Sequence, residues 1–292
     1  MYELIQVSEN NYYIQCPARV GVIRTALDRA CLIDGGSDRD AGKKIKRILD
    51  ANGWTLEAIY NTHAHADHTG GNQYLQSQTG CRVYAPGIEA HLAAWPVLEP
   101  ALLFGGNPPG DLRHKFLLAQ ASSALPVTPE ALPEGVEAIP LPGHSFDMAG
   151  YKTAEGIVYL ADCLSSRETL EKYQISFLVD VEAYLNTLES VKAMDGRLFV
   201  PAHADAVEDV APLAQLNIDK VWEIAGRILE ICAEPVGFEA ILKALFDAYA
   251  LKMTFEQHAL VGSTVRSYLS WLKDAGRLEA EFSRNMLLWK AV

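Results

Sequence analysis

Cysteines are few in this sequence, and their spacing builds no recognisable site. There are five among 292 residues, odd in number and never in a CxxC pair, at Cys16, Cys31, Cys81, Cys163 and Cys232. Disulfide frameworks and thiolate zinc sites show paired spacings, so neither is indicated. We expect reduced, buried thiols, with Cys163 in the core.

Long apolar runs are also missing. No stretch reaches the roughly 20 apolar residues needed to cross a bilayer, and residues 1–10 lack a basic segment followed by an apolar one. We therefore expect no membrane partner and a soluble, cytoplasmic protein. Hydrophobic residues make up 49% of the chain, enough for one large core or one core and a small appended domain.

An excess of basic residues is absent as well. The formal net charge is −12, and the acidic excess lies in residues 1–210, with 16 basic against 27 acidic residues, while residues 211–292 have 9 against 10. An acidic surface repels phosphate backbones, so the composition argues against nucleic acid as a general partner.

Short β patterns, turns and a few helices follow one another along residues 1–210. Apolar alternation bounded by turn residues predicts strands over residues 12–15, 21–25, 30–33, 56–60, 82–85, 136–141, 157–160 and 198–200. Helical spacing predicts helices over residues 43–51 and 72–77. This mixture predicts an α/β domain.

Residues 86–134 read as a long, irregular insertion. They contain eight of the 14 prolines and a Gly- and Pro-rich run at residues 104–110. Loops of this length in a compact domain are usually functional. We expect a lid, for which apolar surface is offered by Leu102, Leu103, Phe104 and Phe116; a contact in a homodimer is the open alternative.

The character of the chain changes to helices from about residue 211. Apolar stripes at helical spacing run from Phe238 to Tyr249 and from Val261 to Leu272, and Gly276 is expected to end the second helix. The tail, residues 277–290, alternates enough for a hairpin. Helices followed by a hairpin predict a small helical, winged-helix-like domain over residues 211–292.

The residues that carry chemistry are concentrated between residues 62 and 71. This segment places His63, His65, Asp67 and His68 within six positions. In extended backbone, side chains at positions 63, 65 and 67 point to one side, and the turn that begins a helix can bring His68 inward. One short loop could thus supply ligands to two metal ions.

Three more candidate ligands follow predicted strands further along the chain. His144 comes after residues 136–141, Asp162 after the strand predicted at 157–160, and His203 after residues 198–200. Each is expected just past the end of its strand. Ligands delivered from several strand ends converge at one rim of a sheet, where loops on a rigid scaffold hold a metal site.

These motifs resemble those of the metallo-β-lactamase superfamily: THxHxDH, a downstream Gly-His, an Asp at a strand end and a last His at a strand end. The resemblance covers residues 1–210 and implies a four-layer αβ/βα sandwich. It implies that the first metal is held by His63, His65 and His144, and the second by Asp67, His68 and His203. Asp162 would bridge both metals, and Asp34 would orient a ligand histidine.

Two motifs depart from the family pattern. Asp147 stands three residues after His144 where small residues are common, and His203 is flanked by alanines, in Pro-Ala-His-Ala-Asp, rather than by glycine. These departures concern the pocket more than the ligands. Related lactonases use a tyrosine from the segment after the bridging Asp; for Tyr173 core packing is the favoured interpretation. The remaining histidines are expected to be structural or exposed: His91, His114 and His258.

The ligand set predicts a hydrolase. Two divalent cations that share a water lower its pKa and supply hydroxide, and imidazoles suit zinc, with iron or manganese as alternatives. Asp67 could accept a proton or deliver it to the leaving group. We expect a small-molecule ester, thioester or lactone as substrate, as in relatives that resemble glyoxalase II.

Two other functions stay open at this point. One is a nuclease that uses the C-terminal domain on RNA, against which the near-neutral charge of residues 211–292 argues. The other is a sulfur dioxygenase with one iron. The flavodiiron branch is disfavoured because it has a Glu where His65 stands and needs a flavin domain that is absent here.

Overall fold

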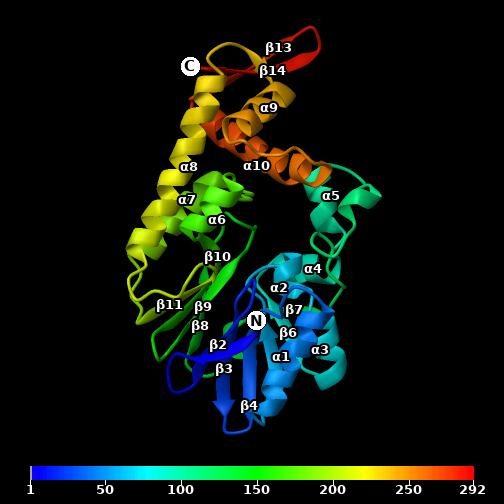
Figure 1. Cartoon of the computed structure of the whole chain (residues 1–292), viewed down its shortest axis with the longest axis vertical. Helices are drawn as coiled ribbons and strands as arrows, with labels where there is room; N and C mark the ends of the chain where they lie inside the picture. The colour runs from blue at the N-terminus through cyan, green and yellow to red at the C-terminus, as the bar shows by residue number, and fades with distance from the viewer. Residues whose placement is uncertain (1) are drawn as a thin grey trace.

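Two β-sheets form the centre of the structure, a computed structural model that describes residues 2–292 (Figure 1). The seven-stranded sheet has its strands in chain order: β1 (Glu3–Gln6), β2 (Asn11–Gln15), β3 (Val20–Ala26), β4 (Arg29–Ile33), β5 (Thr55–Tyr60), β6 (Arg82–Ala85) and β7 (Ala124–Pro126). The four-stranded sheet, in the order β11-β10-β9-β8, consists of β8 (Val136–Pro140), β9 (Ala149–Thr153), β10 (Ile157–Ser165) and β11 (Leu198–His203).

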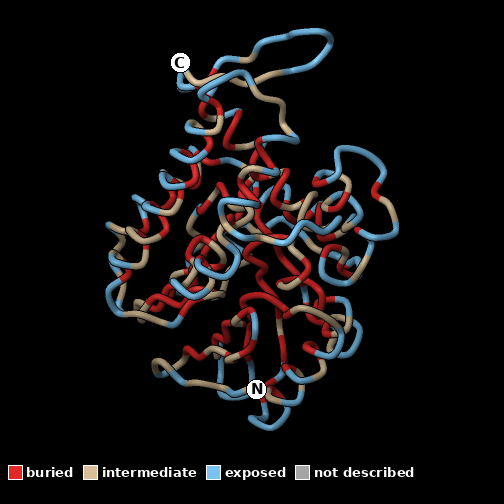
Figure 2. The backbone as a smooth tube through the Cα atoms, turned by 45° about the horizontal axis from the view of Figure 1, so that its top comes forward, coloured by how far each residue is buried: buried red, intermediate tan, exposed pale blue. Residues whose placement is uncertain are grey.

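Alternating side chains let each sheet pack on both faces. In β4, Cys31 and Ile33 join Tyr159 of β10 in the cluster between the sheets, whereas Ala30 and Leu32 face the opposite way. Helices α1 (Arg39–Ala51) and α3 (Asn72–Thr79) cover that outer face, and α7 (Val181–Lys192) and α8 (Ala211–Ile231) cover the four-stranded sheet. The predicted four-layer αβ/βα sandwich is confirmed, with buried backbone through its centre (Figure 2).

The prediction that residues 86–134 are irregular is wrong in part. The segment contains α4 (Glu89–Ala94), α5 (Leu98–Phe104), β7 and two short 3-10 helices, η1 (Gly110–Leu112) and η2 (Pro129–Ala131). Its prolines are compatible with these elements, because Pro100 lies in the first turn of α5 and Pro126 ends an edge strand. The prolines therefore indicated a segment divided into short helices and a short strand. These elements were too short to show the sequence period of a helix or a strand.

The C-terminal helices and hairpin form where the sequence predicts them. They comprise β12 (Val236–Gly237), α9 (Phe238–Ala248), α10 (Phe255–Asp274), β13 (Leu278–Ser283) and β14 (Met286–Ala291), and the three strands pair in the order β12-β14-β13. Their apolar side chains belong to the same hydrophobic cluster as β10, α7 and α8. Within residues 2–292 no helix is long and apolar enough to cross a membrane. The winged-helix assignment and the boundary at residue 210 stay predictions.

A close backbone approach fixes the loop that carries His144. Gly143 has φ +121°, and a Cβ there would meet the backbone nitrogen of Tyr184 in α7. The backbone nitrogens of Val179 and Asp180 also donate to the Gly143 carbonyl, at 2.9 and 3.0 Å. Only a glycine allows α7 to pack this closely against the loop.

We expect Gly143→Ala to lower the free energy of unfolding by at least about 2 kcal/mol more than Gly53→Ala. Gly53 is the control, because its φ of +70° is also positive and nothing lies within 4 Å of its added Cβ. Urea denaturation of both variants makes the comparison. Equal losses would mean that the approach of α7 does not require glycine.

Candidate metal centre

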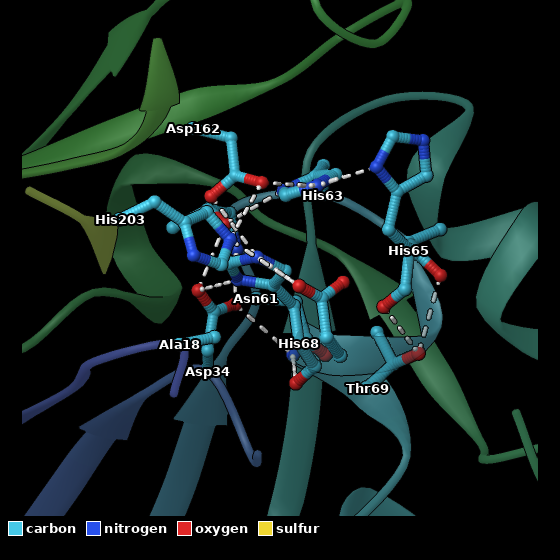
Figure 3. A network of polar contacts seen from close by, with 12 residues as sticks. Ala18, Asp34, Asn61, His63, His65, His68, Thr69, Asp162 and His203 are labelled. Carbon is cyan, nitrogen blue, oxygen red and sulfur yellow. Dashed lines mark hydrogen bonds and ion pairs between the residues drawn. The ribbon is translucent and has the colours of Figure 1, made fainter. Parts of the chain in front are cut away.

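The structure brings the seven predicted ligands together at one end of the two sheets. Their ligand atoms form two groups, each within 4.8 Å, that share Asp162. The first group consists of His63, His65, His144 and Asp162, and the second of Asp67, His68, Asp162 and His203. Figure 3 shows Asp162 and His203 facing His63 and His68 across this space. The grouping is the one that the family resemblance implies.

The segment after β5 supplies four of the seven. The prediction of an extended backbone holds for His65, with φ −58° and ψ 149°, but it is wrong for Asp67, because helix α2 (Ala66–Thr69) begins directly after His65. The turn of α2 carries both Asp67 and His68 inward. A Cβ on Gly71 would meet the carbonyl oxygen of Gly35, so this glycine lets α2 pack against the end of β4.

Two of the three downstream ligands lie inside strands rather than past them. Strand β10 continues to Ser165, so Asp162 is within it, and His203 is the last residue of β11. A register shift between Tyr159 and Ala161 interrupts the β10–β11 ladder, and Ala161 has φ +53°. Such an irregularity redirects side chains, here just before Asp162. His144 follows β8 as predicted.

Three imidazole nitrogens converge in the first group. His65 Nδ1 lies 2.9 Å from His63 Nε2 and 3.0 Å from His144 Nε2. Asp162 Oδ2 faces the same space, 3.9 Å from His63 Nε2 and 3.5 Å from His144 Nε2. Four donor atoms of this kind suit a divalent transition metal such as zinc.

The second group surrounds the same aspartate from the other side. His68 Nε2 lies 3.0 Å from Asp162 Oδ1, and His203 Nε2 lies 3.2 Å from Asp162 Oδ2. Asp67 Oδ2 completes the group at 3.3 Å from His203 Nε2 and 3.6 Å from His68 Nε2. The two oxygens of Asp162 therefore face both groups, as expected for a bridging ligand.

Asp34 orients two of the histidines. Its Oδ2 lies 2.7 Å from His68 Nδ1 and accepts a hydrogen bond from the Thr62 hydroxyl at 2.9 Å, while Oδ1 accepts from the Thr62 backbone nitrogen. The Thr62 hydroxyl lies 3.0 Å from His63 Nδ1. Nδ1–H therefore donates outward in His68 and His63, so that in the neutral imidazoles the Nε2 lone pairs are directed into the groups. This matches the role predicted for Asp34.

The unpaired atoms of the site fit a cation. With Nδ1–H of His68 donating to Asp34, Nε2 of His68 faces Asp162 Oδ1 at 3.0 Å, and when the imidazole is neutral neither of these buried atoms has a hydrogen-bond partner within residues 2–292. His144 repeats the pattern, since its Nδ1 lies 3.0 Å from the Phe177 carbonyl and its Nε2 faces His65. Lone pairs that face one another in a buried space are stabilised by a positive ion between them.

Arg19 holds the loop on either side of His203. Its backbone nitrogen donates to the Ala202 carbonyl at 3.1 Å, and its guanidinium donates to the Ala204 carbonyl and to Asp205 Oδ1, the latter at 2.6 Å. The unusual residues around His203, which are Ala202, Ala204 and Asp205, thus bind Arg19, and these contacts hold the loop of this ligand in place.

The electrostatics differ between the two groups. Burial lowers the pKa of His63, His65 and His144, to about 3 for His65, so these three imidazoles are neutral. The Asp162 carboxylate raises the pKa of His203 to about 10. Burial opposes the same effect at His68, but Asp162, Asp67 and Asp34 raise its pKa well above the ordinary value. Protons therefore compete with a metal ion mainly in the second group.

A cavity of about 1000 Å³ opens onto both groups. Its walls come from the segment 86–134 through Leu103 and Phe116, from α6 (Arg167–Tyr173) through Tyr173, and from α10 through Leu260. Tyr173 is 49% exposed and lines the cavity, so the prediction of core packing is wrong. Helix α10 of the C-terminal region is thus part of the cavity wall.

The other predicted residues fall into three classes. Leu102 and Phe104 are exposed and are not among the cavity walls; Phe104 instead stacks on Phe255. Cys163 is a buried core thiol, as expected. The structure places the three remaining histidines outside both groups: His91, His114 and His258.

Apart from Asp34, sequence reasoning missed the residues that support the ligands. Thr62 was detectable because it directly precedes His63. Arg19 and Phe177 carry no signal in the sequence, since each is distant in the chain from the ligand it supports.

The comparisons with known proteins agree with this geometry. The family model described as Metallo-beta-lactamase superfamily matches residues 14–203, a range that contains all seven residues. The chain belongs to the metallo-beta-lactamase superfamily. Its cluster of histidines and aspartates indicates a divalent-metal site, as expected for a metallo-hydrolase of this superfamily.

Curated relatives in the superfamily include proteins named hydroxyacylglutathione hydrolase. One from Nitrosococcus oceani is 37% identical over 124 residues, which are 38% of this chain and 43% of that protein. One from Methylococcus capsulatus is 49% identical over 81 residues, 28% of each chain. The matched regions thus span less than half the length of these relatives.

Solved structures in the superfamily match nearly the whole fold. A beta-lactamase domain protein from Burkholderia ambifaria has a TM-score of 0.74 at 18% identity and covers 99% of this chain and 94% of its own. A metallo-beta-lactamase family protein from Thermus thermophilus has a TM-score of 0.69 at 14% identity, covering 100% and 98%. The shared fold therefore includes the C-terminal helices.

The protonation of His203 predicts how pH changes the stability of the metal-free chain. Its pKa rises from 6.5 to about 10 on folding. The resulting stabilisation is fully present below pH 6.5 and is lost as pH rises through about 10. As pH rises between these values, the free energy of unfolding of chelator-treated wild type should fall relative to that of chelator-treated His203→Ala. Urea denaturation across this range measures the difference; a constant difference would contradict the charge assignment.

Proposed function

We propose that this chain hydrolyses a small-molecule ester, thioester or lactone in a reaction that depends on two divalent metal ions, with zinc as the native metal. The observation that carries the proposal is Asp162, whose two oxygens face two separate sets of imidazole and carboxylate donors. His63, His65 and His144 would hold one ion, and Asp67, His68 and His203 the other. When bound, two such cations would supply Lewis acidity and hydroxide at neutral pH.

Among the residues of this chain, Asp67 is the one that would transfer protons. Partial removal from water opposes its ionisation, but His68 and His203 lower its pKa, so it is a carboxylate at neutral pH. Its side chain is 41% exposed and lines the cavity. A carboxylate in this position can accept the proton of an attacking water and return it to a leaving thiol or alcohol.

The cavity supports a small substrate over a nucleic acid. Its apolar wall includes Leu103, Phe116 and Phe177, which suit an acyl group. Three carboxylates line it in addition to the metal groups (Glu168, Asp205 and Glu256), besides Glu99, whose pKa burial raises well above its usual range, against two basic residues (Arg19 and Lys172). This balance disfavours a polyanionic backbone, and no observation favours the nuclease or the dioxygenase. The relatives named hydroxyacylglutathione hydrolase support a thioester within the proposed class.

We expect the purified chain to bind about two transition-metal ions after saturating reconstitution. Asp162→Ala should abolish hydrolysis while the protein stays folded, because both groups lose their shared ligand. Elemental analysis, circular dichroism and activity measure the three quantities. A wild-type stoichiometry that stays near one would contradict the dinuclear proposal, and retained activity in folded Asp162→Ala would remove this residue from the site.

We expect a panel of thioesters, lactones, β-lactams and phosphodiesters to show the fastest turnover among the thioesters or lactones. Phe116→Ala should then raise KM for the best substrate about tenfold with little change in kcat, because it removes a cavity wall. Leu102→Ala is the matched control, since Leu102 belongs to the same segment, is 55% exposed and does not line the cavity.

The same two variants distinguish a lid from a homodimer contact. Light scattering on each variant reports the oligomeric state. If Phe116→Ala changes the oligomeric state and leaves KM unchanged, the segment 86–134 is a subunit contact and the lid proposal fails.

A further inference from the structure

A single buried carboxylate joins the two loops that carry the first group. Glu89, the first residue of α4, is fully buried. Its Oε2 accepts a hydrogen bond from the backbone nitrogen of Ala64 at 2.9 Å, and Ala64 lies between His63 and His65. Its Oε1 accepts from the Ser145 hydroxyl at 2.6 Å and from the Asp147 backbone nitrogen at 3.1 Å.

We propose that Glu89 is a positioning residue that holds the three histidines of the first group at their common focus. One oxygen fixes the loop of His63 and His65, and the other fixes the loop of His144. The two loops are about 80 residues apart in the chain, and their imidazoles approach within 3.0 Å. A rigid link between these loops sets the separation of the three ligand nitrogens before any metal arrives.

Asp147 completes the link in the reverse direction. Its Oδ2 accepts from the backbone nitrogen of Ile88 at 2.8 Å, and a Cβ on Gly87 would collide with this carboxylate. The start of α4 and the His144 loop thus exchange hydrogen bonds both ways. This accounts for the carboxylate at position 147, which departs from the family pattern.

The second group is held by other means. His68 depends on Asp34, and the flanks of His203 depend on Arg19. Glu89 makes none of its hydrogen bonds to α2 or to β11. Loss of Glu89 should therefore weaken metal binding at the first group and leave the second nearly unchanged. A role confined to stabilising α4 would instead lower thermal stability without distinguishing the two groups.

Glu89→Gln tests the link with little change in side-chain volume. An amide has one acceptor oxygen and one NH2 group, so it must turn the NH2 group toward either Ala64 or the Ser145–Asp147 pair. One of the two loops then loses its acceptor. Glu155→Gln is the matched control, because Glu155 also accepts from a backbone nitrogen, that of Asn10, but holds no ligand loop.

The readout is the zinc dissociation constant at each group, measured by chelator competition. Because the inference rests on the proposed dinuclear site, His203→Ala and His144→Ala first define backgrounds in which one group is damaged. We expect Glu89→Gln to weaken the ion that remains in His203→Ala by about 10- to 100-fold. In His144→Ala the same substitution should change the zinc dissociation constant of the remaining ion by less than about twofold. Glu155→Gln should leave the zinc dissociation constant unchanged in both backgrounds.

The two possible failures are distinguishable. If wild type does not bind two ions, or the two backgrounds do not keep one each, the proposed function fails. If they do, and Glu89→Gln weakens both groups equally or neither, the positioning role is wrong. Should Glu89→Gln not fold, Ser145→Ala removes one donor to Oε1 and should weaken the first group alone by about fivefold; an unchanged first group in that variant would also overturn the proposal.

Discussion

The Asp162 carboxylate, whose side chain is only 9% exposed, is surrounded by four imidazole nitrogens, and the rest of the site is arranged to make its removal from water tolerable. Its oxygens lie 3.0 to 3.9 Å from His63, His68, His144 and His203. A carboxylate removed from water needs compensating positive charge. In the metal-free chain protons on His68 and His203 provide it, and in the proposed holoenzyme the metal ions would take their place.

Each of the two sheets supplies part of this site. The seven-stranded sheet supplies Asp34 at the end of β4 and the ligand segment after β5, whereas the four-stranded sheet supplies Asp162, His203 and the loop of His144. The cluster between the sheets, with Ile33, Tyr60 and Tyr159, fixes their separation. The site therefore forms only once the sandwich has formed. The cavity above it needs one further layer, because α10 and the segment 86–134 close its walls.

Much of the fold was predictable, for reasons that particular elements illustrate. The strand at residues 82–85 was predicted at its observed bounds, because an apolar run with clear turn residues leaves one interpretation. Strands β1 and β9 and helices α6 and α7 were not predicted. Their burial patterns depend on neighbours distant in the chain, as in β9, which pairs with β8 and β10. In residues 86–134 the prolines masked α4, α5 and β7, which are too short to show a period.

The family and the seven candidate ligands were predictable from the sequence alone, because metal coordination demands particular donor types and four of them lie within six consecutive positions. Their division into two groups followed from the family resemblance. Most of what holds the ligands became apparent only in the folded chain: the start of α2 that turns Asp67 inward, the position of Asp162 inside β10, and the links through Glu89 and Arg19. Such links join residues far apart in the chain, and their hydrogen bonds exist only between backbones that the folded sandwich has already brought together.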